Sequence, residues 1–183
     1  MNRYDAIALM HEWTQNESLR KHMLCVETVM RSYSQKFQQE EELWGITGLL
    51  HDFDYEKYPN PPDHPLKGSE ILKELGYPEE MRIAILGHAS YTNTPRESLL
   101  AKTLFACDEL CGFIVACSLV KPDKKVASVE VRSVKKKLKD KGFARNVSRE
   151  DIINGAIELG VNLDDHIQFV IDSLKANAEN LGL

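Results

Sequence analysis

Six imidazole and carboxyl side chains stand on apolar helical segments of this sequence or beside their ends: His22, His51, Asp52, His64, His88 and Asp108. Asp108 is the most unusual, because it lies inside the apolar segment LFACDELCGF. A carboxylate in such a segment is costly to bury unless a cation neutralises it. Taken singly, a histidine on an apolar helix face is more often a hydrogen-bonded core residue than a ligand. Several together favour a metal site, since buried charges are usually paired or bound to metal.

The types of these side chains restrict the metal. Imidazole nitrogens and carboxylate oxygens without a nearby thiolate favour Fe, Mn, Co, Ni or Zn over Ca or a thiolate cluster. The four cysteines contain no C-x-x-C pair, and three of them lie at helical spacing in one apolar stretch. We interpret the cysteines as small buried hydrophobes in a reducing compartment. Spacing alone does not define the metal site, because its candidate ligands come from five predicted helices.

The elements that must position these residues are helices, since apolar residues recur every three to four positions and no alternating run predicts a sheet. The fold class that follows is all-α, as an orthogonal bundle of helices. Pro65 and Gly76 are placed to begin and end one helix, and Ser148 to cap another. The predicted helices cover residues 4–14, 17–39, 41–52, 65–76, 78–88, 95–120, a basic segment within 131–141, 148–159 and 163–180.

Length and composition indicate one soluble globular domain. The 183 residues suffice for a single sizeable core, and 43% hydrophobic with 28% charged residues is typical of a folded soluble protein. No segment approaches the roughly 20 apolar residues that span a bilayer. The N-terminus, MNRYDAIALMHEW, lacks the pattern of a signal peptide. We therefore expect a cytoplasmic protein without a membrane partner.

The charge balance argues against stable nucleic-acid binding. A net charge of -5 is unfavourable near a phosphate backbone, which rewards clustered lysine and arginine. The one basic run, VRSVKKKLKDK, is more simply interpreted as a solvated helix face.

The order of the six residues resembles the H…HD…H…H…D signature of the HD-domain superfamily of metal-dependent phosphohydrolases, in its two-metal subset. The segments HPLKGSEIL, ILGHAS and LLAKTLFACDEL are similar to those of bacterial HD proteins that include the symmetrical dinucleoside tetraphosphate hydrolases. The resemblance covers about residues 16–120, which we expect to form the metal-binding core, with residues 121–183 as a helical extension. This chain reads His51-Asp52-Phe53-Asp54 where many relatives read His-Asp-Ile-Gly.

The resemblance implies a centre with two divalent transition-metal ions. His22, His51, Asp52 and Asp108 would hold one ion, and Asp52, His64 and His88 the other, so that Asp52 is a shared and catalytic ligand. Two such ions hold a hydroxide at neutral pH and stabilise in-line displacement at phosphorus. The implied function is hydrolysis of a small phosphate ester or anhydride, and we expect a nucleotide substrate.

Phosphate binding requires further cations and hydrogen-bond donors near the metals. Lys67 follows His64 by three residues, so both can project from one helix face. The segment ASYTNTPR after His88 is rich in donors and offers Tyr91 and Arg96. We predict that Lys67, Tyr91 and Arg96 bind substrate.

Asp54 is the loop carboxylate best placed to orient water or to act as an acid, and we include it as a catalytic candidate. Stabilisation of a turn is the alternative interpretation of Asp54. His11 and His166 are predicted to be surface histidines outside the site.

Two other functions are compatible with the same ligands. Some HD-domain proteins with a similar arrangement use a di-iron pair for oxygen-dependent cleavage, which substrate-dependent oxygen consumption would reveal. A non-catalytic sensor would bind a metal and a nucleotide without turnover. The sequence leaves the oligomeric state and the native metal open.

Overall fold

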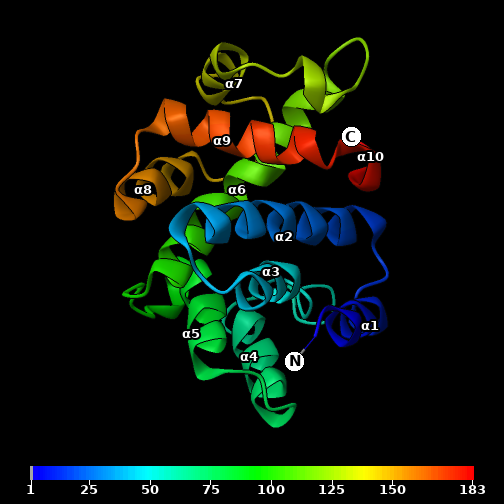
Figure 1. Cartoon of the computed structure of the whole chain (residues 1–183), viewed down its shortest axis with the longest axis vertical. Helices are drawn as coiled ribbons and strands as arrows, with labels where there is room; N and C mark the ends of the chain where they lie inside the picture. Colours follow the sequence, from blue (N-terminus) through cyan, green and yellow to red (C-terminus); the bar gives the residue numbers. More distant parts are fainter. Residues whose placement is uncertain (1) are drawn as a thin grey trace. The chain divides into compact units, whose positions relative to one another are not determined.

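The chain is helical, as the periodicity predicts. The computed structural model describes residues 2–183, and no β-strand occurs in that range. Figure 1 shows the helices in chain order. No helix among the described residues combines the length and apolar character needed to cross a membrane. The all-α prediction is confirmed.

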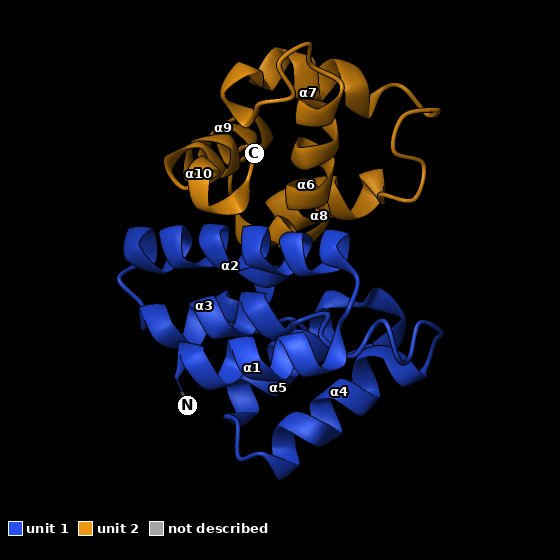
Figure 2. Ribbon diagram, turned by 90° about the vertical axis from the view of Figure 1, so that its right-hand side faces the viewer, with its two compact units in different colours: residues 1–105 blue, residues 106–183 orange. Residues whose placement is uncertain are grey.

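The structure divides into two compact units, coloured separately in Figure 2. The boundary follows Phe105 and lies inside one helix, α6 (Leu99–Leu119). The prediction of a single domain, with an extension from residue 121, stays a prediction. The other helices of the first unit are α1 (Arg3–Trp13), α2 (Glu17–Phe37), α3 (Glu41–Leu50), α4 (Asp63–Glu74) and α5 (Glu79–His88), with a 3₁₀ turn, η1 (Ser90–Thr92).

Helix α3 is central to the first unit, because it lies against α1, α2 and α5, and α5 in turn packs on α4. In the second unit α9 has the corresponding role and contacts its neighbours on several sides. The helices there are α7 (Val131–Leu138), α8 (Arg149–Leu159), α9 (Leu163–Ala176) and α10 (Ala178–Leu181), with a 3₁₀ turn, η2 (Val126–Ser128).

Capping residues explain where several helices begin. The Asn16 side chain accepts hydrogen bonds from the backbone N–H groups of Ser18 and Leu19 at the start of α2. Ser148 accepts one from Asp151 at the start of α8, as predicted. Each cap supplies a partner for backbone donors that the first helical turn leaves unpaired.

Several predicted boundaries differ from the structure, and one of them is the start of α4, which is Asp63 and not Pro65. Helix α6 begins at Leu99 and not at residue 95, since the Ser98 hydroxyl accepts a hydrogen bond from Ala101 N–H and so starts the helix. The last predicted helix divides into α9 and α10 at Asn177. Helix α3 ends at Leu50, and residues 51–57 form turns in place of another helical turn.

The cysteines are buried, as predicted, and the reducing compartment stays a prediction. All four cysteines are buried and none forms a disulfide. Burial raises the pKa of Cys25 to about 12, and it also raises the pKa of Cys107 well above its usual range. These thiols stay protonated, so they are poor metal ligands and behave as small core residues.

Candidate metal centre

Two histidines end helices and bond back to their own helix. His51 is the C-cap residue of α3, and its Nδ1 lies 2.8 Å from the Gly48 carbonyl oxygen. His88 is the last residue of α5, and its Nδ1 lies 2.5 Å from the Ile85 carbonyl oxygen. Because a carbonyl only accepts, each Nδ1 carries a proton, and Nε2 is the nitrogen left to face Asp52 or a metal. Both rings are therefore oriented so that they can bind a metal through Nε2.

Asp52 follows directly, in the turn after α3, and its two oxygens face different histidines. Oδ2 lies 3.4 Å from His51 Nε2 and 3.8 Å from His22 Nε2. Oδ1 lies 3.2 Å from His64 Nε2 and 3.4 Å from His88 Nε2. One carboxylate thus lies between two pairs of imidazole nitrogens.

Each pair of nitrogens makes a position for one ion. His22 Nε2 and His51 Nε2 are 3.2 Å apart, and His64 Nε2 and His88 Nε2 are 3.4 Å apart. One ligand atom each from Asp52, His64 and His88 lies within 4.8 Å of the others. Converging nitrogen and oxygen donors fit a divalent transition metal. We call the His22–His51 side the first position and the His64–His88 side the second.

The electrostatics keep Asp52 ionised. Burial would raise the pKa of Asp52, but the charge of His51 and hydrogen bonds from His51, His64 and His88 hold it well below its usual range. Burial would lower the pKa of His64, but hydrogen bonds to Asp52 and Asp54 outweigh it and raise the pKa to about 9. At neutral pH protonated His64 therefore contributes positive charge beside Asp52.

Comparison with protein families decides the assignment. The family model of the HD domain matches residues 19–112, just over half of the chain, and that range contains all six predicted ligands. The chain belongs to the HD-domain family. No curated protein and no solved structure matches it. At the level of the superfamily, the HD domain indicates a metal-dependent phosphohydrolase, and the two histidine pairs around Asp52 fit metal binding.

The sixth predicted ligand of the HD domain is Asp108. It lies on α6, in the second compact unit, and is half-buried. Its role as a ligand beside His22 and His51 stays a prediction.

Lys67 differs from its expected setting. The backbone at His64 and Pro65 is not helical, with ψ of 136° at His64, so the spacing that would align Lys67 with His64 on one face is not present. The Lys67 ammonium lies at the surface and pairs with Glu70 at 3.1 Å. Substrate binding by Lys67 stays a prediction.

Tyr91 and Arg96 support the ends of the HD-domain helices. The Tyr91 hydroxyl donates a hydrogen bond of 2.7 Å to the His64 carbonyl oxygen. Burial, together with Asp52 and Asp54, raises the pKa of Tyr91 to about 12, so the hydroxyl remains a donor. Arg96 donates to the Gly87 carbonyl oxygen at 2.8 Å and lies over the Phe105 ring at 3.7 Å. Their predicted contacts with substrate are not tested by this geometry.

Sequence reasoning missed Tyr55. Its ring lies edge-to-face with His64, with centroids 5.0 Å apart, and it is 43% exposed. Tyr91, also beside His64, is 46% exposed. An aromatic residue three positions after the His-Asp pair was the available signal. Two accessible tyrosines thus contact the histidine of the second position, Tyr55 through its ring and Tyr91 through its hydroxyl group.

Asp54 is fully buried, and both of its oxygens are engaged. Oδ1 accepts from His64 Nδ1 at 2.8 Å, and Oδ2 accepts from Gly68 N–H at 2.8 Å. The carboxylate thereby joins the turn after α3 to the start of α4. Its predicted catalytic role remains untested.

Of the two histidines expected at the surface, one is buried. His11 is exposed, but His166 is 1% exposed and its Nε2 lies 2.9 Å from the Ala106 carbonyl oxygen. The prediction for His166 was wrong because its acidic neighbours suggested a solvated face, while this hydrogen bond satisfies the ring in the interior of the second unit.

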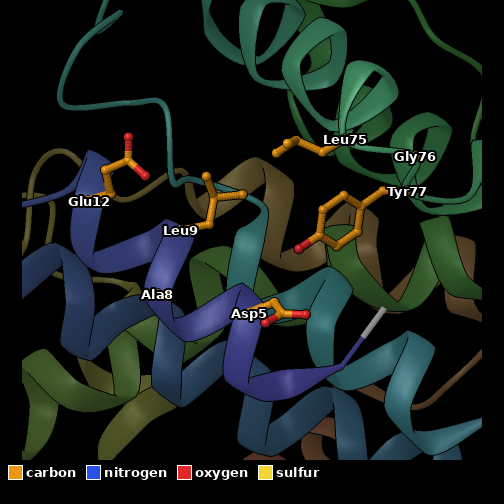
Figure 3. Close-up of a pocket in the computed structure, with 7 residues that line it drawn as sticks. All are labelled: Asp5, Ala8, Leu9, Glu12, Leu75, Gly76 and Tyr77. Atoms are coloured by element: carbon orange, nitrogen blue, oxygen red, sulfur yellow. The ribbon is translucent and has the colours of Figure 1, made fainter.

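A surface hollow of about 390 Å³ lies elsewhere in the first unit, between α1 and the connection from α4 to α5 (Figure 3). Asp5 and Leu9 line it from α1, and Leu75 and Tyr77 line it from the other side. Figure 3 shows the Tyr77 hydroxyl pointing toward Asp5, and burial together with Asp5 raises the pKa of Tyr77. None of the predicted ligands lines this hollow, so we do not assign it to the metal centre.

Proposed function

We propose that the protein is a two-metal phosphohydrolase that cleaves a phosphate ester or anhydride bond of a small nucleotide. The observation that carries the proposal is the position of Asp52, whose two oxygens face separate pairs of histidine Nε2 atoms at 3.2–3.8 Å. A carboxylate in that position can bridge two cations. Asp52 therefore has the central role among the proposed ligands.

The proposed ligand set follows from the two positions. The first ion would be held by His22, His51, Asp52 and Asp108, and the second by Asp52, His64 and His88. Asp108 is included because it is a carboxylate in an apolar helical stretch and lies within the matched residues 19–112. Iron, manganese, cobalt, nickel and zinc all suit imidazole and carboxylate donors.

When bound, the ions would supply a Lewis acid and lower the pKa of a water molecule so that it attacks phosphorus. The residues of the chain hold the ligand side chains in the orientation that the ions would need. The Nδ1 hydrogen bonds of His51 and His88 fix both rings, so that each Nε2 points away from its own helix. We propose that Arg96 and Lys67 bind phosphate oxygens, which a guanidinium or ammonium group suits.

The proposal of a nucleotide substrate rests on the aromatic rings at the second position. Tyr55 and Tyr91 lie beside His64 and are each close to half exposed. Stacking of a base on such a ring contributes about 1–3 kcal/mol. The resemblance to bacterial symmetrical dinucleoside tetraphosphate hydrolases points to the same substrate class.

A metal-by-substrate screen tests this function. Chelator-treated protein is reloaded separately with Mn²⁺, Co²⁺, Ni²⁺, Fe²⁺ or Zn²⁺ and incubated with nucleotides, dinucleoside polyphosphates and glycerol phosphate. We expect phosphate or nucleotide release with at least one metal and none after chelation. Absence of release in every preparation, or oxygen consumption by the iron form without phosphate release, would overturn the proposal.

A substitution of Tyr55 tests separately whether the substrate is a nucleotide. Tyr55→Ala should raise KM for a nucleotide by roughly 5- to 150-fold, which corresponds to the stacking energy of about 1–3 kcal/mol. The KM for glycerol phosphate, which has no ring to stack, should change less than about twofold. Equal effects on both substrates would contradict base stacking at Tyr55.

A further inference from the structure

We infer that Asp54 is a positioning residue, which sets the tautomer and orientation of His64 and so determines the affinity of the second metal position. The inference rests on the proposed function and deepens it. It also replaces the expectation that Asp54 acts as an acid on the substrate. The basis is the pair of hydrogen bonds from Asp54 to His64 and Gly68.

Asp54 has no access to a substrate in this structure. Its side chain is fully buried, and each oxygen already accepts a hydrogen bond of 2.8 Å. The Asp54 carbonyl oxygen also accepts from the N–H groups of Lys57 and Tyr58, at 3.1 and 2.9 Å. The residue is thus held at both backbone and side chain, and it connects the turn after α3 to α4.

His64 bonds through Nδ1 to a residue outside its own helix, whereas His51 and His88 bond within theirs. His51 and His88 each bond through Nδ1 to the carbonyl three residues earlier in their own helix. His64 stands where α4 is kinked, with ψ of 136°, so no preceding helical turn offers it a carbonyl. The carboxylate of Asp54 takes that place.

The hydrogen bond also fixes which nitrogen of His64 carries the proton. Gly68 N–H can only donate, so Asp54 accepts from Gly68 with one oxygen and from His64 Nδ1–H with the other. His64 Nε2, 3.4 Å from His88 Nε2, is then the nitrogen that can bind a metal after releasing its proton. A carboxylate partner additionally raises the basicity of a ligand imidazole.

Gly68 makes the close approach possible. A Cβ atom at this position would lie 2.7 Å from Asp54 Cγ, which is closer than side-chain carbons tolerate. Glycine inside a helix costs up to about 1 kcal/mol relative to alanine. Its presence in α4 is consistent with a site where the carboxylate must reach the helix backbone.

Asp54→Asn tests the inference, because asparagine cannot accept from both donors. The NH2 group of asparagine must face one of these two donors. If it faces His64 Nδ1, the ring proton moves to Nε2. If it faces Gly68 N–H, two donors lie together without an acceptor. Asp63→Asn is the matched control, since Asp63 is exposed at the start of α4 and adjacent to His64. Chelator-treated full-length proteins are titrated with Mn²⁺ by calorimetry, and bound metal is counted after gel filtration.

We expect wild type to bind two ions and Asp54→Asn to bind the second one roughly 10- to 100-fold more weakly. The first ion should change less than about threefold, and Asp63→Asn should match wild type. Reference variants identify the position. Adding Asp54→Asn to His88→Ala should leave the affinity of the remaining ion unchanged, whereas adding it to His22→Ala should weaken the remaining ion by the same roughly 10- to 100-fold.

The outcomes separate the two proposals. If wild type binds no metal, the proposed function fails. If wild type binds two ions and Asp54→Asn binds both equally well, only the role of Asp54 is overturned. Equal weakening of both ions, with circular dichroism matching wild type, also overturns a role specific to the second position.

A direct measurement covers the case in which Asp54→Asn does not fold. Long-range ¹H–¹⁵N spectra of the zinc-loaded wild type should report His64 protonated at Nδ1, and a His64 ring protonated at Nε2 would overturn the inference. Gly68→Ala, which alters neither carboxylate nor ligand, should weaken the second ion in the same direction as Asp54→Asn. Unchanged two-ion binding in folded Gly68→Ala would count against the Asp54–Gly68 contact.

Discussion

Asp52 Oδ1 lies 3.2 Å from His64 Nε2. The other oxygen of this carboxylate lies 3.4 Å from His51 Nε2, on the opposite side. The predicted ligands are therefore not equivalent, because Asp52 faces both metal positions and each histidine faces only one. Substitutions at Asp52 and at the histidines should consequently have different effects on metal content.

Asp52→Ala should abolish binding of both ions and lower hydrolysis by more than about 100-fold, which exceeds the loss usual for a residue that only supports a ligand. The reason is that neither histidine pair keeps an anionic partner. Elemental analysis after reloading with Mn²⁺ and a phosphate-release assay check this. A variant that retains both ions would contradict the assignment of Asp52 as the shared ligand.

His88→Ala should remove one ion and leave the other, since His88 Nε2 faces only Oδ1 of Asp52. His22→Ala should likewise cost one ion, because His22 Nε2 faces Oδ2. His11→Ala is the control, as His11 is exposed and outside both positions. Metal-to-protein ratios measured in parallel check all three, and a loss of two ions from either ligand variant would argue against separate positions.

The sequence predicts which residue types form this centre but not how their rings are oriented. His51 and Asp52 could be identified because a polar pair that ends an apolar helix face needs a partner when buried. The ring directions depend on hydrogen bonds at Nδ1, which depend on local backbone conformation. At His64 that conformation leaves the helix, and its partner Asp54 is ten residues away in the chain. No periodicity encodes such a contact.

The raised pKa of His64 predicts a pH dependence of stability in chelator-treated protein. A folded-state pKa of about 9, above the ordinary 6.5, contributes stability that is complete below about pH 6.5 and is lost as the pH rises through 9. The shift corresponds to at most about 3 kcal/mol. Urea unfolding of the chelator-treated protein between pH 6.5 and 9.5 should show this decline.

His64→Gln provides the control, because it removes the titrating ring and should flatten this part of the pH profile. Protons also compete with metal at His64 Nε2, so the apparent affinity of the second ion should increase with pH up to about 9. A wild-type profile with the same slope as His64→Gln would contradict the assignment of this pKa.

Glu27 is a buried charge on α2 that the helical periodicity does not identify. Its carboxylate accepts from Arg3 Nε at 2.6 Å and from Arg31 Nε at 3.0 Å. Glu27→Gln should lower the free energy of unfolding by roughly 2–4 kcal/mol, because a buried ion pair loses one partner. Urea unfolding checks this. Glu17→Gln, in the same helix but 83% exposed beside Arg20, should cost less than about 1 kcal/mol.

In the second unit, α8 packs on α6 through backbone, at a contact that admits no side chain. A Cβ atom on Gly155 would lie 2.6 Å from Ala106 Cα. Gly155→Ala should therefore destabilise the protein by about 1–3 kcal/mol, although alanine is the better helix former, because two helices must move apart. Gly142→Ala is the control, since its nearest neighbour is Asp140 Oδ1 at 3.4 Å, an ordinary contact. Thermal unfolding of both variants checks this, and a Gly155→Ala protein as stable as wild type would show that α8 can shift without loss.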